Sequence, residues 1–302
     1  MKQRLDVDVG GRRVTISSPD RMLWPEAGFT KSDALLYYTR IAPALLPEIR
    51  DRPLTLKRAP EGAHGPWWYQ TECPRPPAWM RTIAVAGAEG DKTWNYCAAD
   101  EPAALVWLAN LGCLELHPLL FVERDPEHPL DLVFDLDPGP PAGLVETAAV
   151  ALTLRSALAG VGLRSFVKSS GAAGLHVVVP LDGTRTFDDT RTFARLVAET
   201  VEAADESVVT EKGPRARRGK VLIDWQQNGR FRSVAGPYSL RLARLPYVAA
   251  PLAWEELEEA VAQRSDDRLL LLPDEVLERV ESGADPWQSA DRSPQAVPAG
   301  SP

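Results

Sequence analysis

Hydrophobic and polar residues alternate in the first stretch of the chain. Apolar side chains take every second position in residues 5–9 and again in 12–16, with two glycines between the runs. A period of two is typical of β-strands, and a glycine pair permits the tight turn of a hairpin. The pattern changes at Thr30, which forms a capping-box sequence with Asp33 and predicts a helix that continues to about residue 47.

The remaining elements follow from the same patterns. Helices are expected at 103–109, 144–159, 186–204, 253–263 and 274–281, and strands at 131–137, 166–170, 175–181, 221–225 and near 231–235. Residues 60–82 are rich in Pro, Gly and Trp and are expected to form a surface loop. Residues 286–302 are mostly Ser, Pro, Ala and Gln, which favours a disordered tail. The irregular order of strands and helices predicts an α+β fold.

Composition limits the class of protein. The chain has 302 residues, of which 44% are hydrophobic and 25% charged, enough for one large domain or two closely joined lobes. There is no apolar run of about 18 residues and no apolar block at the N-terminus, so we expect neither a membrane span nor a signal peptide. The three cysteines are scattered without a C-x-x-C pair, which argues against a disulfide framework or a structural zinc site. The chain is therefore expected to be cytoplasmic and reduced.

The net charge of −8 and a pI near 5.2 argue, taken alone, against a nucleic-acid partner. Positive charge is nevertheless concentrated locally, at Lys212, Arg215, Arg217, Arg218 and Lys220. Such a cluster on an acidic protein can hold phosphate. The alternative is a solvated loop of charges.

The strongest local signal for chemistry is the run Asp131–Pro138. Because side chains alternate faces along a strand, Asp135 and Asp137 project from one side while Leu132, Phe134 and Leu136 face the core. Two carboxylates on one face repel each other unless a cation joins them, as in a Mg²⁺ or Mn²⁺ site. The alternative is a pair of solvated acids at the end of an edge strand.

A second signal is a glycine-bounded turn between two strands. Gly171 and Gly174 permit a tight turn with exposed N–H groups, which suits an anion. Ser170 and His176 flank the turn and offer a hydroxyl and an imidazole to a triphosphate. The alternative is an ordinary hairpin with a satisfied histidine.

A third signal is Asp224, alone in an apolar strand. A buried carboxylate is costly without a cationic partner, so it is either ion-paired with an arginine or a third metal ligand. Arg241 follows and could neutralise charge that develops on a phosphate. Alone, it would more often be a surface arginine.

Together these motifs resemble the polymerase domain of bacterial DNA ligase D, of the archaeo-eukaryotic primase superfamily. The motifs are Asp135-Leu136-Asp137-Pro138, Ser170-Gly171-x-x-Gly174-Leu175-His176, Ile223-Asp224-Trp225, Asn228-x-Arg230 and Pro237-Tyr238-Ser239-x-Arg241. Upstream, the resemblance includes Ser18–Pro25, Thr30-Lys31, Arg52-Pro53-Leu54, Trp68-Tyr69-Gln70 and Leu114–Pro118, and it covers about residues 15–257. It implies a primase-polymerase fold with a central mixed or antiparallel sheet flanked by helices. It also implies one domain over 1–285, with an N-terminal DNA-binding part at about 1–125, a catalytic part at about 126–260 and C-terminal helices at about 253–282.

The resemblance also implies roles for individual residues. Asp135, Asp137 and Asp224 would bind two divalent ions, often Mn²⁺ and otherwise Mg²⁺, while Ser170, His176, Arg241, His117 and Lys168 would hold the nucleotide. Arg21 and Lys31 would grip a 5′-phosphate across a DNA gap, and Lys57, Arg58 and Lys220 would also contact DNA. Trp68 and Tyr69 would stack on bases, although such aromatics could instead be core residues.

The expected activity is therefore addition of nucleotides, ribonucleotides included, at DNA gaps or break ends that carry a 5′-phosphate. The chain departs from the family at Ala173 and Thr71, where lysine is common, and the spacing of Arg244 is unusual. A stand-alone polymerase associated with the nucleoid is expected, with a separate ATP-dependent DNA ligase and Ku as candidate partners. Two alternatives are a non-catalytic module that bridges DNA ends and a metal-dependent phosphohydrolase.

Overall fold

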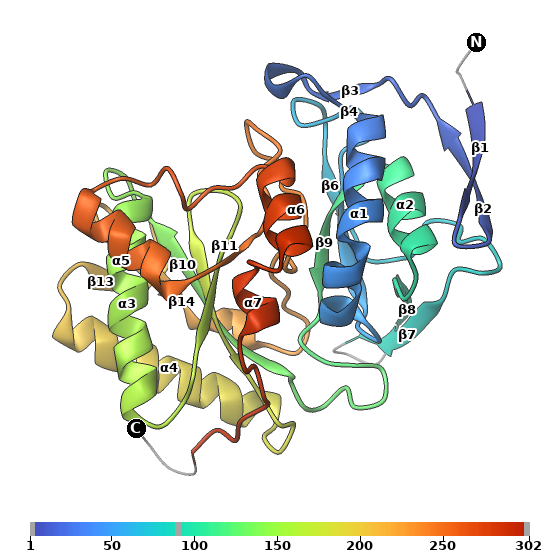
Figure 1. Cartoon of the computed structure of the whole chain (residues 1–302). Coiled ribbons are helices and arrows are strands. Elements are labelled where there is room, and N and C mark those ends of the chain that lie inside the picture. Colours follow the sequence, from blue (N-terminus) through green and yellow to red (C-terminus); the bar gives the residue numbers. More distant parts are fainter. Residues whose placement is uncertain (1–3, 88–91, 299–302) are drawn as a thin grey trace.

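Two β-sheets, one from each half of the chain, carry the fold (Figure 1). The computed structural model describes residues 4–87 and 92–298. Helices cover each sheet, and the cavity described below lies between the two halves. The fold is α+β, as the sequence predicts.

The N-terminal half begins with the predicted hairpin and helix. Its strands are β1 (Arg4–Val9), β2 (Arg12–Ser17), β3 (Met22–Trp24), β4 (Phe29–Thr30), β5 (Leu54–Arg58), β6 (Trp68–Gln70), β7 (Thr82–Ala86), β8 (Thr93–Cys97) and β9 (Cys113–Pro118); its helices are α1 (Lys31–Ile49), α2 (Pro102–Asn110) and the 3₁₀ turn η1 (Pro25–Ala27). The capping box is confirmed, because the Thr30 hydroxyl accepts a hydrogen bond from Asp33 N and the Asp33 carboxylate accepts one from Thr30 N. Strands β5 to β9 form an antiparallel sheet in which β5 pairs with β6, β8 and β9.

The C-terminal half is built on a six-stranded sheet in the order β13-β14-β10-β12-β11-β15. Its strands are β10 (Asp131–Pro138), β11 (Phe166–Ser169), β12 (Leu175–Pro180), β13 (Val208–Val209), β14 (Val221–Asp224) and β15 (Pro251–Leu252); its helices are α3 (Leu144–Gly160), α4 (Phe187–Ala204), η2 (Trp225–Asn228), α5 (Trp254–Gln263), α6 (Pro273–Ser282) and α7 (Pro286–Ser289). All its pairings are antiparallel except β13 with β14. No helix in the described residues is long and apolar enough to cross a bilayer.

The alternation along β10 decides which face of this sheet is open. Leu132, Phe134 and Leu136 are fully buried in the cluster that also contains the apolar residues of α3 and α4. The intervening residues point to the opposite face, where Val133 joins a second cluster. The two carboxylates of this strand therefore face away from the covering helices, as predicted.

The segment 229–250 joins the two halves. The Tyr37 hydroxyl on α1 donates to the Tyr238 carbonyl at 2.7 Å, and Gly236 N donates to the Leu116 carbonyl on β9 at 2.8 Å. A Cβ at Gly236 would lie 2.9 Å from Pro118, so only glycine allows this close approach. The segment thereby brings Arg241 alongside the N-terminal sheet.

Two element predictions need correction. The strand expected near 231–235 is irregular, because this segment crosses between the sheets and makes only one isolated bridge, from Ser233 to Leu119. The loop expected at 60–82 contains β6, which pairs with β5 at the edge of the N-terminal sheet. Trp68 and Tyr69 are both exposed and apolar residues precede them, so β6 lacks the alternation of buried and exposed positions that marks a strand.

The prediction of a disordered tail from residue 286 is wrong for residues 286–298; residues 299–302 lie outside the described part. Trp287 is 4% exposed and donates through Nε1 to the Val167 carbonyl at 3.1 Å. Arg292 lies over the Trp287 ring at 4.1 Å and pairs with Glu48 on α1 at 2.6 Å. One large aromatic and one bidentate ion pair hold a segment whose composition otherwise favours disorder.

The expectation that no disulfide forms is also wrong. Cys73 and Cys97 are bonded, although 24 residues separate them. The backbone of Cys73 donates to the Asn95 carbonyl on β8 at 2.7 Å, which brings the two cysteines together. The disulfide depends on this contact between distant parts of the chain and not on the spacing of the cysteines. Their spacing therefore gives no support for a reducing compartment.

Candidate active site

Three carboxylates lie on neighbouring strands at the open face of the C-terminal sheet. Asp135 on β10 is the direct cross-strand partner of Asp224 on β14, and Asp137 lies two residues further along β10. Direct partners in an antiparallel pair point to the same face, and so do residues two apart on a strand. The register thus gathers the three acids predicted from the sequence.

Two of the carboxylates, Asp135 and Asp137, have a raised pKa. Burial and the charges of Asp135 and Asp224 raise the pKa of Asp137 to about 6, although Arg217 opposes this. Burial also raises the pKa of Asp135, against the nearby charges of Lys168 and Arg241. Three acids held this close favour a site that receives positive charge.

Two cations from the loop 211–220 lie against these acids. Lys212 Nζ is 2.7 Å from Asp224 Oδ2, and Arg217 Nη2 is 3.8 Å from Asp137 Oδ2. Gln227 Nε2 also donates to Asp224 Oδ2 at 2.9 Å. In this arrangement no three acid, histidine or cysteine side chains of residues 4–87 and 92–298 converge on one point as metal ligands do.

The donor set nevertheless fits Mg²⁺ or Mn²⁺, which prefer carboxylate oxygen. The Lys212 side chain is 47% exposed, so it can leave Asp224 without disturbing the core. Lys212 and Arg217 offset the negative charge of Asp224 and Asp137, as divalent ions would do in their place. A metal ion bound by these carboxylates would have to displace the two cations.

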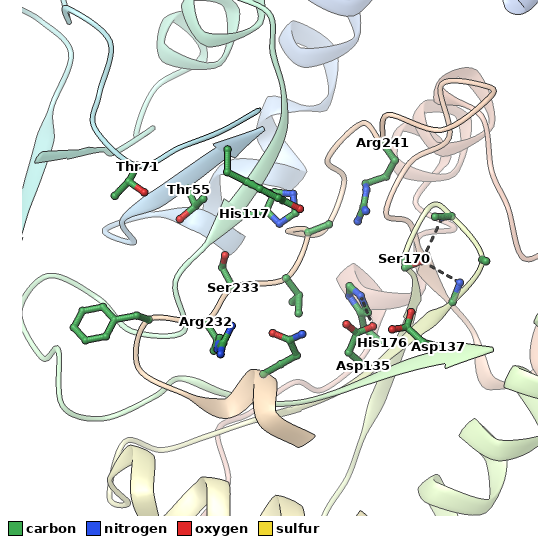
Figure 2. A pocket seen from close by; sticks show the side chains of 18 of the residues that line it. Thr55, Thr71, His117, Asp135, Asp137, Ser170, His176, Arg232, Ser233 and Arg241 are labelled. Carbon is green, nitrogen blue, oxygen red and sulfur yellow. Dashed lines mark hydrogen bonds and ion pairs between the residues drawn. The ribbon is translucent and has the colours of Figure 1, made fainter. Parts of the chain in front are cut away.

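A cavity of about 550 Å³ opens beside the carboxylates (Figure 2). Its polar lining includes Thr55, Thr71, His117, Asp135, Asp137, Ser170, His176, Gln227, Arg232, Ser233 and Arg241. Asp135, Asp137 and His176 come from the C-terminal sheet and Ser170 from the turn between β11 and β12, whereas Thr55 and His117 come from the N-terminal sheet. Arg241 reaches the cavity from the joining segment (Figure 2).

The glycine-bounded turn forms one end of the cavity. Ser170 Oγ accepts hydrogen bonds from Ala172 N at 3.3 Å and Gly174 N at 3.2 Å. These two N–H groups, expected to be exposed, are therefore already used, and the Ser170 hydroxyl is left to donate into the cavity. Gly174 is required because a Cβ would collide with the Leu136 carbonyl oxygen.

His176 is fixed on both of its ring nitrogens. Nε2 lies 3.3 Å from Asp135 Oδ1, and Nδ1 lies 2.6 Å from Nζ of Lys168. Burial and the positive charges of Lys168 and Arg241 hold the pKa of His176 well below its ordinary value. Lys168 itself is 1% exposed and does not line the cavity. Lys168, predicted from the resemblance to hold the nucleotide, thus lies behind His176 and not in the cavity lining.

Glu115, on β9, connects the cavity residues of the N-terminal sheet with Arg241. Its carboxylate is fully buried and lies 2.9 Å from His117 Nε2, 3.1 Å from Lys57 Nζ and 3.3 Å from Arg241 Nε. Leu242 N also donates to it at 2.7 Å. Burial alone would raise the pKa of Glu115, but the His117 hydrogen bond and the charges of Arg241, His117 and Lys57 lower it to about 2.

Three consecutive aromatic residues, Trp67 and the β6 residues Trp68 and Tyr69, are exposed, and Tyr69 lines the cavity. The exposed fractions are 51% for Trp67, 41% for Trp68 and 57% for Tyr69, so core packing is excluded. Lys57 Nζ lies 4.3 Å from the Trp67 ring centre, and the Arg58 guanidinium 5.2 Å from that of Trp68. Exposed aromatics on a pocket rim are suited to stacking on bases.

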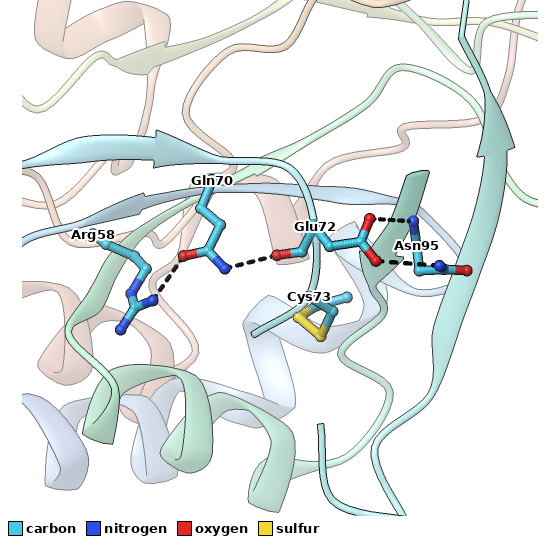
Figure 3. The surroundings of a disulfide bond; sticks show 6 residues. Arg58, Gln70, Glu72, Cys73 and Asn95 are labelled. Atoms are coloured by element: carbon cyan, nitrogen blue, oxygen red, sulfur yellow. Dashed lines mark hydrogen bonds between the residues drawn. A yellow bond between two sulfur atoms is a disulfide. The ribbon is translucent and has the colours of Figure 1, made fainter. Parts of the chain in front are cut away.

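Hydrogen bonds next to the disulfide hold this edge in place (Figure 3). Arg58 Nη1 donates to Gln70 Oε1 at 2.7 Å, and Gln70 Nε2 donates to the Glu72 carbonyl at 2.7 Å. The Glu72 carboxylate in turn accepts from Asn95 N at 2.9 Å. The aromatic strand is thereby tied to β8 by polar contacts as well as by the sulfur bridge.

Comparison with known proteins agrees with this geometry. The model of the LigD primase-polymerase domain matches residues 30–287. The chain belongs to the LigD primase-polymerase domain family. The polymerase domain of Mycobacterium tuberculosis ligase D, solved in complex with DNA, matches with a TM-score of 0.84 and 34% identity over 91% of this chain and 97% of that one.

Full-length relatives of this LigD polymerase domain are much longer. The multifunctional non-homologous end joining DNA repair protein LigD of M. tuberculosis is 34% identical over 96% of this chain, which spans 41% of the relative. The bifunctional non-homologous end joining protein LigD of Bacillus subtilis is 27% identical over 95% of this chain, which spans 45% of it.

The structure places Arg21 and Lys31 together but away from the cavity lining. Lys31 Nζ donates to the Ser17 carbonyl at 2.7 Å, and Arg21 Nη1 to the Pro60 carbonyl at 2.8 Å. Burial and the charge of Arg21 lower the pKa of Lys31 to about 8. Within the described residues neither cation has a carboxylate at ion-pair distance, which leaves room for an anion.

The first N–H groups of α1 are not free to bind an anion beside these two side chains. Lys31 N already donates to the Arg21 carbonyl, Ser32 N to Pro19 O and Asp33 N to Thr30 Oγ1. Lys220, also predicted to bind DNA, lies at the end of the loop 211–220, where its carbonyl accepts from Gly139 N at 2.8 Å. Any phosphate contact at α1 must therefore come from the two side chains.

Two residues of the site were missed from the sequence, Glu115 behind the cavity and Arg232 in its lining. Glu115 could have been found by the argument used for Asp224, since it is an acid in the apolar run Cys113–Leu116. Arg232 is exposed and lines the cavity with no ion-pair partner among the described residues. Nothing in its local pattern distinguishes it from a surface arginine.

We predict that Glu115→Gln lowers the free energy of unfolding at neutral pH by about 3–5 kcal/mol, because it leaves buried cations uncompensated. The folded-state pKa of about 2 lies below the ordinary 4.5, so the ionised carboxylate stabilises fully above about pH 4.5 and loses this effect as pH falls towards about 2. Urea unfolding should therefore show the gap between wild type and variant shrinking over this window.

The matched control is Glu281→Gln, which removes one partner of the exposed Arg40–Glu281 pair and should cost less than about 1 kcal/mol. A Glu115→Gln deficit that stays constant from neutral pH to about pH 3 would contradict the assignment of this pKa.

Proposed function

We propose that this domain is a template-directed nucleotidyltransferase that adds ribonucleotides or deoxyribonucleotides to DNA at gaps or break ends. The observation that carries the proposal is the single cavity in which Asp135, Asp137, Ser170, His176 and Arg241 meet beside an exposed aromatic edge. Membership of the LigD primase-polymerase family supports it.

Each part of the cavity has a task in nucleotidyl transfer. A primer 3′-hydroxyl oxygen attacks the α-phosphorus, its proton is lost, and the bond to the leaving pyrophosphate breaks. Asp135, Asp137 and Asp224 would hold two Mn²⁺ or Mg²⁺ ions, which stabilise the attacking and leaving oxygens. Ser170 and His176 would donate to phosphate oxygens, and Arg241 would offset the charge of the leaving group.

The DNA side of the proposal rests on exposed rings and cations. Trp68 and Tyr69 offer stacking surfaces, and Lys57 and Arg58 lie behind them. The similar polymerase domain of M. tuberculosis ligase D was solved with DNA, which supports a DNA substrate here. Stacking contributes about 1–3 kcal/mol per base without sequence preference, as gap filling requires.

The two alternative functions account for fewer features. A module that only bridges DNA ends needs no cluster of three acids in which the neighbouring charges raise the pKa of Asp137. A phosphohydrolase would use the acids but has no task for the exposed ring of Tyr69 in the cavity lining or for its exposed neighbour Trp68. Because the relatives are named for non-homologous end joining, we assign this pathway as a proposal, with a separate ATP-dependent ligase and Ku as candidate partners.

We predict that Asp137→Ala abolishes primer extension on gapped DNA, by at least about a thousandfold, because the acids act as one unit. Binding of gapped DNA and the unfolding transition should be retained, since Asp137 is partly exposed. Asp188→Ala, an exposed acid on α4, is the control and should extend normally. Extension by Asp137→Ala at near wild-type rate would rule this site out.

A second prediction concerns the Arg21–Lys31 pair. Gapped DNA with a 5′-phosphate should bind about tenfold or more tightly than DNA without it, and the preference should fall as salt rises. Because the pKa of Lys31 is about 8, its charge is lost as pH rises through that value, so the preference should also weaken from about pH 7 to 9. Fluorescence anisotropy measures all three dependences.

Lys31→Gln and Arg21→Gln should each reduce this preference, whereas Arg13→Gln, whose side chain is 82% exposed on the hairpin, should not. If removal of the phosphate leaves wild-type affinity unchanged at every salt concentration, the assignment is wrong.

A third prediction is that ribonucleotides are inserted at least as well as deoxyribonucleotides. The turn beside the acids offers only Ser170, Ala172, Ala173 and Gly174 to the cavity, so it presents no bulky wall to a 2′-hydroxyl. Single-nucleotide insertion on one gapped template with Mn²⁺ gives kcat/KM for each sugar. A deoxy preference of about tenfold, or about 1.4 kcal/mol, would contradict the prediction.

A further inference from the structure

Lys168 lies directly behind His176 in the C-terminal sheet. The two residues are cross-strand partners on β11 and β12, and both are almost fully buried. Lys168 Nζ is 2.6 Å from His176 Nδ1 and 2.7 Å from the Ala235 carbonyl oxygen. The lysine therefore makes its contacts with the histidine and with the joining segment, not with the cavity.

No carboxylate in residues 4–87 or 92–298 lies at ion-pair distance from Lys168. A buried lysine without such a partner is costly, so simple space filling by an apolar side chain would be more stable. The hydrogen bonds of Lys168 instead indicate that it acts on His176. Burial holds the pKa of Lys168 well below its ordinary value, so its contacts and not its charge define its role. Nζ donates to Ala235, and the Asp135 carboxylate faces the other ring nitrogen of His176 as an acceptor. The remaining partner of Nζ is Nδ1, which carries no proton when it accepts from the lysine.

This requirement sets the tautomer of the neutral histidine. If Nδ1 accepts from Lys168, the ring proton resides on Nε2, which is the atom that faces Asp135 and the cavity at 3.3 Å from Asp135 Oδ1. The opposite tautomer would place a lone pair at the cavity, where it would repel phosphate oxygen.

We propose that Lys168 is a positioning residue that holds His176 in the Nε2–H tautomer, so that the ring donates a hydrogen bond into the cavity. That the acceptor is a phosphate oxygen of a nucleoside triphosphate rests on the proposed function. The tautomer itself does not rest on it.

His117 provides an internal comparison. Its Nε2 faces the Glu115 carboxylate at 2.9 Å, so its ring is held by an acceptor and has no contact with Lys168. A change at Lys168 should therefore alter His176 and leave His117 as it is.

The tautomer can be measured directly, because the chain has only four histidines. Long-range ¹H–¹⁵N spectra of the full chain labelled at histidine, at about pH 8 where an unperturbed imidazole is neutral, distinguish Nε2–H from Nδ1–H. His176→Asn assigns the signal. The wild type should show Nε2–H at His176; a predominant Nδ1–H signal there would overturn the proposal.

Two variants separate positioning from a structural role. Lys168→Met keeps an unbranched chain but removes the donor, so His176 should gain a substantial Nδ1–H population. Lys168→Gln keeps an N–H donor and should restore Nε2–H. An unchanged His176 tautomer in Lys168→Met would overturn the proposal, and if that variant does not fold, Lys168→Leu, which also lacks a donor, is measured in its place with the same expected result.

Equilibrium binding of a fluorescent ribonucleoside triphosphate tests the consequence for the ligand. Lys168→Met should weaken nucleotide binding about tenfold, with partial recovery in Lys168→Gln, and leave gapped-DNA affinity unchanged. If the tautomer behaves as proposed while neither Lys168→Met nor His176→Asn affects nucleotide binding, the proposed function of the cavity fails and the positioning role stands. If nucleotide binding depends on His176 but the tautomer does not depend on Lys168, the positioning role fails instead.

Discussion

One row of cross-strand partners organises the C-terminal half of the cavity. Asp224, Asp135, His176 and Lys168 are direct partners in turn across β14, β10, β12 and β11. A slip of one residue in β10 would turn Asp135 and Asp137 towards α3 and α4 and expose Leu136 in their place. The free-energy cost of burying those charges therefore fixes the register of β10. The register in turn determines which side chains face the cavity.

In the N-terminal sheet, cross-strand partners also place polar and charged residues beside the cavity, but the position of the carboxylate relative to the cavity is different. Lys57 pairs with Glu115 and Thr55 with His117 across β5 and β9, so the carboxylate lies behind the cavity here, whereas in the other sheet it faces the cavity. Arg241 joins the two arrangements, because its Nε lies 3.3 Å from Glu115 while its side chain lines the cavity. Glu115 thus stabilises the partly buried Arg241 at the edge of the cavity from a position outside the cavity lining.

The sequence predicts local elements well because their signals are local. The Thr30–Asp33 capping box and the alternation in 131–137 each depend on neighbours within a few residues, and both are confirmed. The three carboxylates could be predicted because a carboxylate in an apolar strand is costly to bury unless a cation or a metal ion offsets its charge. The Cys73–Cys97 bond, the ordered Trp287 segment and the position of Lys168 behind His176 all depend on contacts between distant parts of the chain, and composition or spacing cannot encode them.

The departures at Ala173 and Thr71 gain meaning from their location. Both residues line the cavity, so lysines there would add positive charge at the turn and near the aromatic edge. In their absence the cavity lining contains two arginines, Arg241 near the turn and Arg232 on the opposite wall (Figure 2). Arg241 pairs with Glu115, whereas Arg232 has no ion-pair partner within the described residues. The lining also contains Asp135 and Asp137, so the attraction of a polyanionic ligand to this place on an acidic chain depends on Arg232 and on cations that offset the two carboxylates.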